Sequence, residues 1–402
     1  MSMNHIKNNL LYKLLSYVYH NFYLKIIFKL EELIYNNKKV SSNKIIIDNF
    51  LGKGLGGNLK YIVEALLKVN SNLDIVWEVA DKNIKLPVGI RKVKYNSPRA
   101  LKELLTAKVW IDNVKNSYKP DKRKEQFYLQ TWHAGLGLKA SEKQIENVLS
   151  PKYVAAAKRD AAMTDLMLSD SDWTTDIYQN WFWYNGSISK TGFPRNDVLI
   201  NQPADMPKKV RSSFGLNEDT KLVLYAPTFR DINSSLDIYK FDFVKIIAAL
   251  ESKFGSDYVV LIKLHPNVAN LLNESNLYKF SSRLKNASFY PDMQELIVAC
   301  DCLITDYSSC MFDAMIAKKK VFLLAKDLDE FEEKDRNLLF DIKKDLPFSF
   351  SNDEDELIKN INLFDDKKYK SDIADFSKEV GLYEDGHASE RVAKIILKEM
   401  AI

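Results

Sequence analysis

Short apolar runs alternate with longer segments of helical periodicity along most of the chain. The run at residues 44–49 (K-I-I-I-D-N) predicts a buried strand, and the spacing of apolar residues over 98–106 predicts a helix. This alternation is typical of a parallel sheet covered by helices. The same pattern predicts further strands at 74–79, 90–95, 109–114, 127–132, 166–169 and 188–192, and helices at 153–163 and 173–183.

A second alternation follows a polar, proline-containing linker at residues 201–207. We therefore expect an α/β protein in which two Rossmann-like halves, each with a parallel sheet, face a central cleft. The last helix, 388–399, could return to pack on the first half. The other elements predicted in the second half are strands at 222–226, 258–264, 302–305 and 321–324, and helices at 241–254, 293–300 and 309–317.

Residues 1–42 form a leader with a different pattern. Apolar residues recur at helical spacing from Leu10 to Ile34, and lysines such as Lys25 interrupt any run long enough to span a bilayer. A basic, aromatic-rich amphipathic helix of this kind can lie in the interface of an anionic membrane. The alternatives are a helix packed on the protein's own surface and a helix that dimerises.

Composition narrows the function classes. The 402 residues are enough for two ordinary domains with full cores. The 58 basic and 54 acidic residues give a net charge of +4, which does not call for a nucleic-acid partner. The three cysteines have no framework spacing, and no secretory signal precedes them, so we expect a reducing compartment and no disulfides.

The segment Ile304 to Ser309 reads as a strand end, a hydroxyl-rich turn and a helix start. A helix start offers unpaired N–H groups and the positive end of the peptide dipole, and the hydroxyls of Ser308 and Ser309 lie beside them. This arrangement suits a phosphate or a diphosphate. The alternative is an ordinary N-cap, which is the commoner role of serine at this position.

Two further predicted strands end in residues that bind anions. His265 follows one strand in K-L-H-P, and Arg230 follows another in Y-A-P-T-F-R. Ligands bind outside the carboxyl ends of the strands in open α/β sheets. We therefore expect the serine, histidine and arginine side chains to form one anion-binding rim.

His133 is the candidate general base. It ends a predicted strand in Q-T-W-H and precedes an open loop that contains Gly135. Near neutral pH an imidazole at this place can accept a proton from a hydroxyl. The alternative is a hydrogen-bonded structural histidine. A third histidine, His387, stands before the last predicted helix, where it is either a plain polar residue or part of the cleft.

Six short motifs stand in a fixed order along the chain. They are Q-T-W-H (130–133), T-G-F-P-R-N-D (191–197), Y-A-P-T-F-R-D (225–231), K-L-H-P (263–266), T-D-Y-S-S (305–309) and D-G-H-A-S-E-R (385–391). This set resembles the CDP-glycerol glycerophosphotransferase family, which contains teichoic acid primases and polymerases and related capsule polymerases. The resemblance covers roughly residues 44–400.

The resemblance implies a GT-B-type fold and the transfer of a polyol phosphate from a CDP-alditol to an acceptor hydroxyl, with release of CMP. It implies catalytic roles for His133 and His265. The residues that match the family's donor-binding motifs are Arg230, His265, Thr305, Asp306, Ser308 and Ser309. The residues expected near the cleft are Gly135, Arg195, Asn196, Asp385 and His387.

The resemblance also implies the organisation of the chain and its partners. After the leader we expect an acceptor-side domain at 43–200, a CDP-donor domain at 201–385 and a C-terminal helix at 386–402. The expected partners are the CDP-alditol, a lipid-linked or polyol-phosphate polymer acceptor and an anionic membrane surface, with no nucleic acid. The expected location is the cytoplasmic face of the bacterial plasma membrane, as a peripheral protein. No cofactor is required, although Mg²⁺ could accompany the donor diphosphate.

One motif departs from the family. Many members continue the first motif as W-H-G-T-P-L-K, whereas this chain has W-H-A-G-L-G-L-K (132–139). The difference leaves the polyol open, so that glycerol phosphate is the first expectation and CDP-ribitol or another CDP-alditol is the alternative. Two other classes also remain, namely a GT-B enzyme that uses a UDP- or GDP-sugar, and a catalytically silent membrane scaffold.

Overall fold

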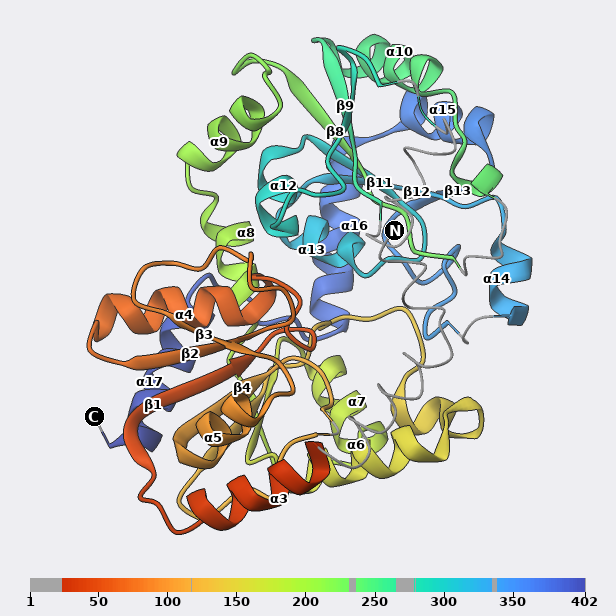
Figure 1. Cartoon of the computed structure of the whole chain (residues 1–402). Coiled ribbons are helices and arrows are strands. Elements are labelled where there is room, and N and C mark those ends of the chain that lie inside the picture. Colours follow the sequence, from red (N-terminus) through yellow and green to blue (C-terminus); the bar gives the residue numbers. More distant parts are fainter. Residues whose placement is uncertain are drawn as a thin grey trace, which may run out of the picture.

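The computed structural model describes residues 24–116, 118–230, 236–264, 278, 280–334 and 338–401. Two parallel sheets dominate these residues (Figure 1). The first sheet has seven strands in the order β3-β2-β1-β4-β5-β6-β7, which begins with the Rossmann order. Its strands are β1 Ser41–Asp48, β2 Asp74–Val79, β3 Arg91–Lys94, β4 Ala107–Asp112, β5 Phe127–Gln130, β6 Leu166–Ser169 and β7 Ser187–Lys190.

The second sheet has six strands in the order β10-β9-β8-β11-β12-β13, and every pairing in it is parallel. The predicted α/β architecture with two parallel sheets is confirmed. We call the residues packed around the first sheet the first lobe and those around the second sheet the second lobe. The strands of the second lobe are β8 Lys221–Tyr225, β9 Tyr258–Ile262, β10 Leu284–Asn286, β11 Cys302–Thr305, β12 Lys320–Leu324 and β13 Ser349–Ser351.

Helices cover the sheets through apolar stripes. In α4 (Gly57–Val69) the buried residues Leu59, Ile62, Val63 and Leu66 follow the spacing of one helix face and pack on the β1 side chains of the first sheet. The other first-lobe helices are α3 Leu24–Tyr35, α5 Pro98–Thr106, α6 Pro151–Met163 and α7 Asp172–Trp181, followed by the connecting helices α8 Asp197–Asn201 and α9 Asp205–Ser213. The second-lobe helices are α10 Phe243–Phe254, α12 Met293–Ala299, α13 Cys310–Ile316, α14 Leu328–Lys334, α15 Glu354–Leu363 and α16 Asp366–Glu379.

The last helix, α17 (Ala388–Met400), lies on the first lobe beside α4 (Figure 1). Its residues Val392, Ile396 and Met400 belong to the same buried cluster as the first sheet. The carboxylate of Asp197 accepts hydrogen bonds from the first backbone N–H groups of α17, at 2.8 and 2.7 Å. This contact supplies the cap that the helix start needs.

The boundaries differ from the sequence prediction where the chain leaves the sheet. The strands predicted at 109–114 and 127–132 end at Asp112 and Gln130. Trp132 has a φ of 53°, which a strand cannot adopt, so the chain turns away from the sheet one residue before His133. The linker predicted at 201–207 is also shorter than expected, because α9 begins at Asp205.

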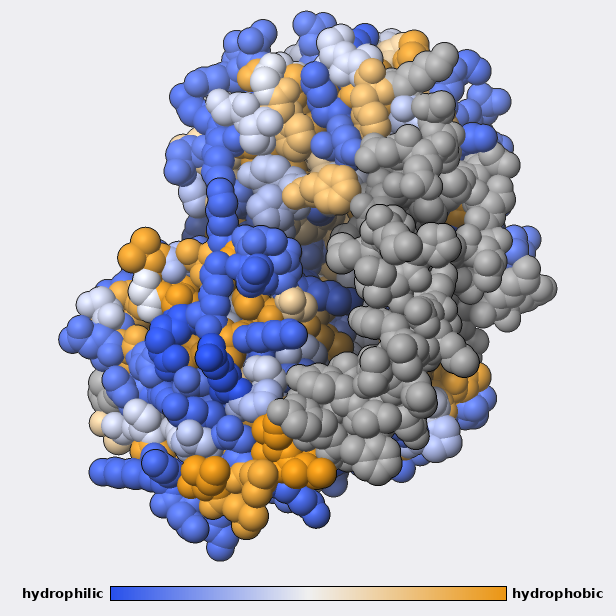
Figure 2. Space-filling model, in the orientation of Figure 1, coloured by the Kyte–Doolittle hydropathy of each residue, from blue (hydrophilic) through white to orange (hydrophobic). Residues whose placement is uncertain are grey.

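The predicted leader falls mainly on residues 1–23, which lie outside the described residues. Its described part, α3, packs against α5 and leaves an apolar stripe at the surface. Figure 2 shows hydrophobic side chains in this part of the surface. The exposed members of the stripe are Ile26, Leu30, Leu33 and Ile34. Among the described residues, every helix is too short or too polar to cross a bilayer.

Candidate functional site

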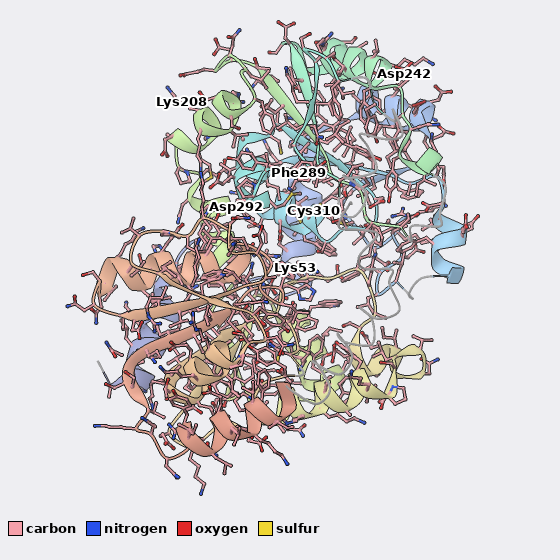
Figure 3. All side chains as sticks on the ribbon, viewed as in Figure 1. Lys53, Lys208, Asp242, Phe289, Asp292 and Cys310 are labelled. Atoms are coloured by element: carbon pink, nitrogen blue, oxygen red, sulfur yellow. The ribbon has the colours of Figure 1, made fainter. Side chains whose placement is uncertain are left out.

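A cleft of about 850 Å³ lies between the two lobes at the carboxyl ends of their strands. The first lobe contributes His133, Gly135 and Arg195 to its lining, and the second lobe contributes Ser308 and Ser309. Figure 3 labels three more lining residues, Lys53 of the first lobe and Asp292 and Cys310 of the second. The structure therefore brings the candidate base and the serine turn to one cavity.

The ring of His133 has a defined orientation. Its Nδ1 atom lies 3.0 Å from the carbonyl oxygen of Asn113. Because a carbonyl oxygen can only accept, Nδ1 carries the hydrogen, and Nε2 holds the lone pair of the neutral imidazole. The rings of Phe50 and Trp132 flank the imidazole, with centroids 5.5 and 4.3 Å from its own.

Asn113 is itself held by the loop that follows β1. Its Oδ1 atom accepts from the backbone N–H of Phe50 at 2.8 Å, and its Nδ2 donates to Asn49 Oδ1 at 2.7 Å. Both side chains are buried. The backbone carbonyl of Asn113, which accepts the hydrogen bond from His133, is thus held in place by two strand ends of the first sheet.

Gly135 is required by its surroundings. A Cβ atom at this position would lie 1.7 Å from Asp170 Oδ2 and 2.8 Å from the ring of Phe193. Asp170 is buried, and burial raises the pKa of its carboxyl despite hydrogen bonds from Thr174 and Ser171. Only a residue without a side chain lets the loop after His133 pass this close to the carboxylate.

The serine turn keeps its hydroxyls in the cleft. β11 ends at Thr305 and α13 begins at Cys310, one residue later than predicted. The side chain of Ser309 caps no described backbone group, and Ser308 Oγ accepts a long 3.5 Å bond from the N–H of Cys310. Ordinary N-capping, the alternative raised by the sequence, therefore does not account for Ser309.

Three residues predicted to bind the donor do not line the cleft. Asp306 Oδ1 accepts from the N–H of Thr228 at 2.7 Å, and Thr305 Oγ1 donates to the carbonyl of Ala226 at 2.7 Å. Arg230 pairs with Asp306 Oδ2 at 2.8 Å and with Asp327 Oδ2 at 2.7 Å. These side chains brace the loop after β8, whose residue Thr228 does line the cleft.

The charge of Arg230 is compensated by two carboxylates within its own lobe. Its side chain is 9% exposed, and burial alone would lower its pKa. The carboxylates of Asp327 and Asp306 outweigh burial and raise the pKa above its usual value. A guanidinium already engaged by two carboxylates has little capacity left for a diphosphate.

The motif at 191–197 divides between two roles. Arg195 lines the cleft, and its guanidinium contacts both lobes. Asn196 is buried away from the cleft, where its Nδ2 donates to Glu384 Oε1 at 2.8 Å. The same carboxylate oxygen accepts from the N–H of Phe193 at 2.9 Å, so the C-terminal segment holds this turn in place.

Asp385 and His387 also lie away from the cleft. Arg391 forms an ion pair with Asp385 at 2.7 Å and holds its pKa down at about 2. The side chain of His387 is 61% exposed. The motif at 385–391 therefore fastens the start of α17 to the first lobe.

His265 lies outside the described residues, but Lys263 and Leu264 just before it line the cleft. Lys263 is a cleft residue that the sequence analysis did not single out. Its Nζ donates to the carbonyl of Tyr290 at 2.7 Å, and burial lowers its pKa to about 8. The available signal was its place at the end of a predicted strand, in the motif K-L-H-P.

Within the described ranges, no group of three or more His, Cys, Asp or Glu side chains is arranged so that it could hold a metal ion. The cysteines Cys300, Cys302 and Cys310 are buried thiols. Burial raises the pKa of Cys300 and of Cys310 to about 12, so both stay protonated at neutral pH.

Comparisons with known proteins find similarity over most of the chain. Residues 31–398 match the family described as CDP-Glycerol:Poly(glycerophosphate) glycerophosphotransferase. The Teichoic acid poly(glycerol phosphate) polymerase of Staphylococcus epidermidis is 31% identical over 384 residues, which cover 92% of this chain and 53% of that protein. The Teichoic acid glycerol-phosphate transferase of Staphylococcus aureus is 29% identical over 387 residues, covering 92% and 98%. The chain thus spans about half the length of that polymerase and nearly all of that transferase.

A solved structure extends the similarity to the whole fold. A variant of the Wall Teichoic Acid Polymerase TagF, soaked with CDPG, superposes with a TM-score of 0.82 at 28% identity. The superposition covers 100% of this chain and 99% of that one. The GT-B-type fold expected from the sequence is therefore confirmed, with the cleft between its two lobes.

Proposed function

Because this chain belongs to the CDP-glycerol:poly(glycerophosphate) glycerophosphotransferase family, we propose that it transfers glycerol phosphate from CDP-glycerol to an acceptor hydroxyl and releases CMP. The acceptor would be the end of a poly(glycerol phosphate) chain or a lipid-linked primer in teichoic acid or capsule synthesis. One observation carries the proposal: His133 and the Ser308–Ser309 turn, from opposite lobes, line the same cleft.

The chemistry assigns one task to each side of the cleft. The acceptor oxygen attacks the phosphorus that bears the glycerol, and the new P–O bond forms as the pyrophosphate P–O bond to CMP breaks. The hydroxyl proton passes to Nε2 of His133, the nitrogen that the Asn113 contact leaves as acceptor. CMP departs with the bonding electrons and gains negative charge.

Groups of the second lobe would stabilise that charge. The hydroxyls of Ser308 and Ser309 can donate to phosphate oxygens, and Lys263 belongs to the same lining. His265 is assigned to the donor phosphates by its motif alone, as are the supporting roles of Arg230, Thr305 and Asp306. We propose that Mg²⁺, where present, enters with the donor diphosphate.

The location is proposed from the leader. The exposed apolar residues of α3 would lie in the headgroup region of an anionic membrane, with lysines Lys29, Lys38 and Lys39 beside them. A peripheral site at the cytoplasmic face of the bacterial plasma membrane would bring a soluble CDP-alditol and a lipid-linked acceptor to one enzyme.

The test is a panel of activated donors offered with a glycerol-phosphate oligomer. We expect CMP release from CDP-glycerol, with products that grow by one glycerol phosphate in mass spectrometry. Faster turnover of CDP-ribitol would reassign the polyol and keep the chemistry. Transfer from a UDP- or GDP-sugar, with none from either CDP-alditol, would contradict the proposal.

A further inference from the structure

Arg195 joins the two halves of the cleft through one guanidinium. Its Nη1 donates to the carbonyl oxygen of His133 at 2.7 Å, in the first lobe. Its Nη2 forms an ion pair with Asp313 Oδ1 at 2.9 Å, in the second lobe. The side chains of Arg195 and Asp313 are only 12% and 9% exposed, so the pair is weakly screened by solvent.

Asp313 belongs to the helix that follows the serine turn. It lies four residues after Ser309, and residues at this spacing share one face of a helix. Its second oxygen, Oδ2, accepts from Gln294 Nε2 of α12 at 3.0 Å. The carboxylate is thus held by a second helix of the same lobe.

The backbone of Arg195 is anchored on the other side. Its N–H donates to Asn58 Oδ1 at 3.2 Å, and Asn58 Nδ2 donates to the carbonyl of Trp132 at 3.4 Å. Both bonds tie the arginine to the start of α4 and to the residue before His133. The two ends of Arg195 therefore hold the base loop of one lobe and the phosphate-side helix of the other.

We propose that Arg195 and Asp313 are positioning residues that keep His133 in register with the Ser308–Ser309 turn. Occupation of the second lobe by a nucleoside monophosphate then orders the loop that carries the base. This inference rests on the proposed function, because it takes the serine turn as the phosphate site. It assigns to Asp313, which lies outside the six motifs quoted from the sequence, a role equal to that of Arg195.

The expected effect is large because the pair is partly buried and charge-assisted. Removing one partner leaves the other charge uncompensated in the cleft wall. A displacement of the base by about 1 Å can cost on the order of a hundredfold in turnover. On this proposal the nucleotide phosphate lies against the second lobe, so nucleotide binding should change much less than turnover.

The experiment compares Arg195→Met, Asp313→Asn and the double variant in the full chain. We expect kcat to fall on the order of a hundredfold in Arg195→Met, with CMP affinity within about threefold of the parent. The double variant should be no worse than Arg195→Met, because both residues act through one contact. Hydrogen exchange supplies a second readout: CMP should protect residues 131–139 in the parent and not in Arg195→Met, while the second lobe stays protected in both.

A matched control is Lys60→Met, which removes two further ion pairs between the described parts of the two lobes. Lys60 pairs with Asp292 and Glu295, and its side chain is 14% exposed, close to the value for Arg195. It should lower thermal stability at least as much as Arg195→Met and leave kcat near the parent value. Retention of kcat in Arg195→Met, multiplicative losses in the double variant, or unchanged protection of residues 131–139 would each overturn the inference. A parent protein that binds CMP and transmits protection but transfers nothing from CDP-glycerol would contradict the proposed function alone.

Discussion

The imidazole of His133 donates through Nδ1 to the backbone carbonyl of Asn113, 3.0 Å away, and this contact selects Nε2 as the basic nitrogen. His133→Ala removes that base without removing any charge from the second lobe. We therefore expect CMP release to fall by about 10²–10⁴-fold, the usual contribution of a general base. Steady-state turnover of CDP-glycerol is the measurement, with calorimetric binding of CMP to show that the donor side is intact.

His387→Ala is the matched control for that substitution. Its side chain is 61% exposed and lies away from the cleft, at the start of α17. Turnover should stay near the parent value. Equal losses in the two variants would indicate that general destabilisation, and not loss of the base, causes the effect at His133.

The loop after His133 contains two glycines, Gly135 and Gly137, for which substitution by alanine should have different effects on stability. A Cβ at Gly135 would lie 1.7 Å from Asp170 Oδ2, whereas the nearest atom to a Cβ at Gly137 is 3.7 Å away. Gly135→Ala should lower the free energy of unfolding by about 1–3 kcal/mol, because neither the buried carboxylate nor Phe193 can retreat easily. Gly137→Ala should leave the melting temperature almost unchanged, and differential scanning calorimetry measures both. A tolerated Gly135→Ala would contradict the packing described around Asp170.

The sequence predicted the sheets well because their signal is local. Runs such as 45–47 and 321–324 are apolar throughout, as expected for strands buried on both faces. His133 and the serine turn could be placed in one cleft because parallel strands present their carboxyl ends at one edge. Those inferences needed only strand order and spacing.

The sequence did not predict how the polar residues pair. Arg230 was expected at the donor, yet it pairs with Asp327, 97 residues further along the chain. Arg195 pairs with Asp313 at a separation of 118 residues. Partners at such separations are chosen by the three-dimensional arrangement of loops, which no periodicity encodes. The sequence also did not predict the lowered pKa of Lys263, because that shift results from burial against the loop after β10.

Lys263 predicts a pH dependence of nucleotide binding. Burial lowers its pKa to about 8, and the partly compensating charge of Asp292 does not restore the usual value. Lys263 is charged below that pH and loses its charge as pH rises through it, while a phosphate monoester stays dianionic above a pKa near 6. We expect the Kd of CMP to increase on the order of tenfold between pH 7 and pH 9, which is the loss of one charge-assisted hydrogen bond. Isothermal titration calorimetry across that range is the measurement.

In the same assay, Lys263→Arg tests whether loss of the positive charge at residue 263 causes the pH dependence. A guanidinium keeps its proton throughout this pH range, so the Kd should become nearly independent of pH. Lys263→Met should bind weakly at every pH. A parent-like slope in Lys263→Met would assign the pH dependence to another group.

Glu78 predicts a loss of stability in alkali. Burial, with the neighbouring charge of Asp48, raises the pKa of this carboxyl well above its usual value, against the hydrogen bond from Tyr118. The folded protein therefore binds the proton more tightly than the unfolded chain does. The stability that Glu78 contributes is present at low pH. It is lost as the pH rises from the pKa of Glu78 in the unfolded chain to its pKa in the folded protein, and over this range the free energy of unfolding falls by up to about 1.4 kcal/mol per pH unit. Glu78→Gln should flatten that decline in urea unfolding at pH 6 to 9.

Glu103 should change the stability with pH in the opposite direction. Burial alone would raise its pKa, but hydrogen bonds from Arg91 and Lys44 outweigh burial and lower it. Its contribution to stability is present above the unfolded pKa and is lost as pH falls through the folded one. Glu103→Gln should therefore be less stable than the parent at pH 7, whereas Glu78→Gln should not be less stable than the parent at this pH. Two variants that both destabilise at pH 7 and above would contradict the raised pKa at Glu78.

The exposed stripe of α3 predicts how the protein meets a membrane. Ile26, Leu30, Leu33 and Ile34 are 52–71% exposed. Replacing all four by serine should greatly reduce co-sedimentation with vesicles that contain anionic lipid, since each buried apolar side chain contributes about 1.5–3 kcal/mol. Because the stripe is exposed on the folded protein, the melting temperature and the turnover of a water-soluble oligomer should stay close to the parent values. Val244→Ser combined with Leu363→Ser removes apolar side chains that are 77% and 68% exposed on the second lobe, and it should leave sedimentation unchanged. An interfacial helix requires that only the α3 variant loses binding, and that binding of the parent depends on anionic lipid and low salt. If both sets of substitutions weaken binding equally, the association with vesicles is non-specific, and α3 packs against protein instead.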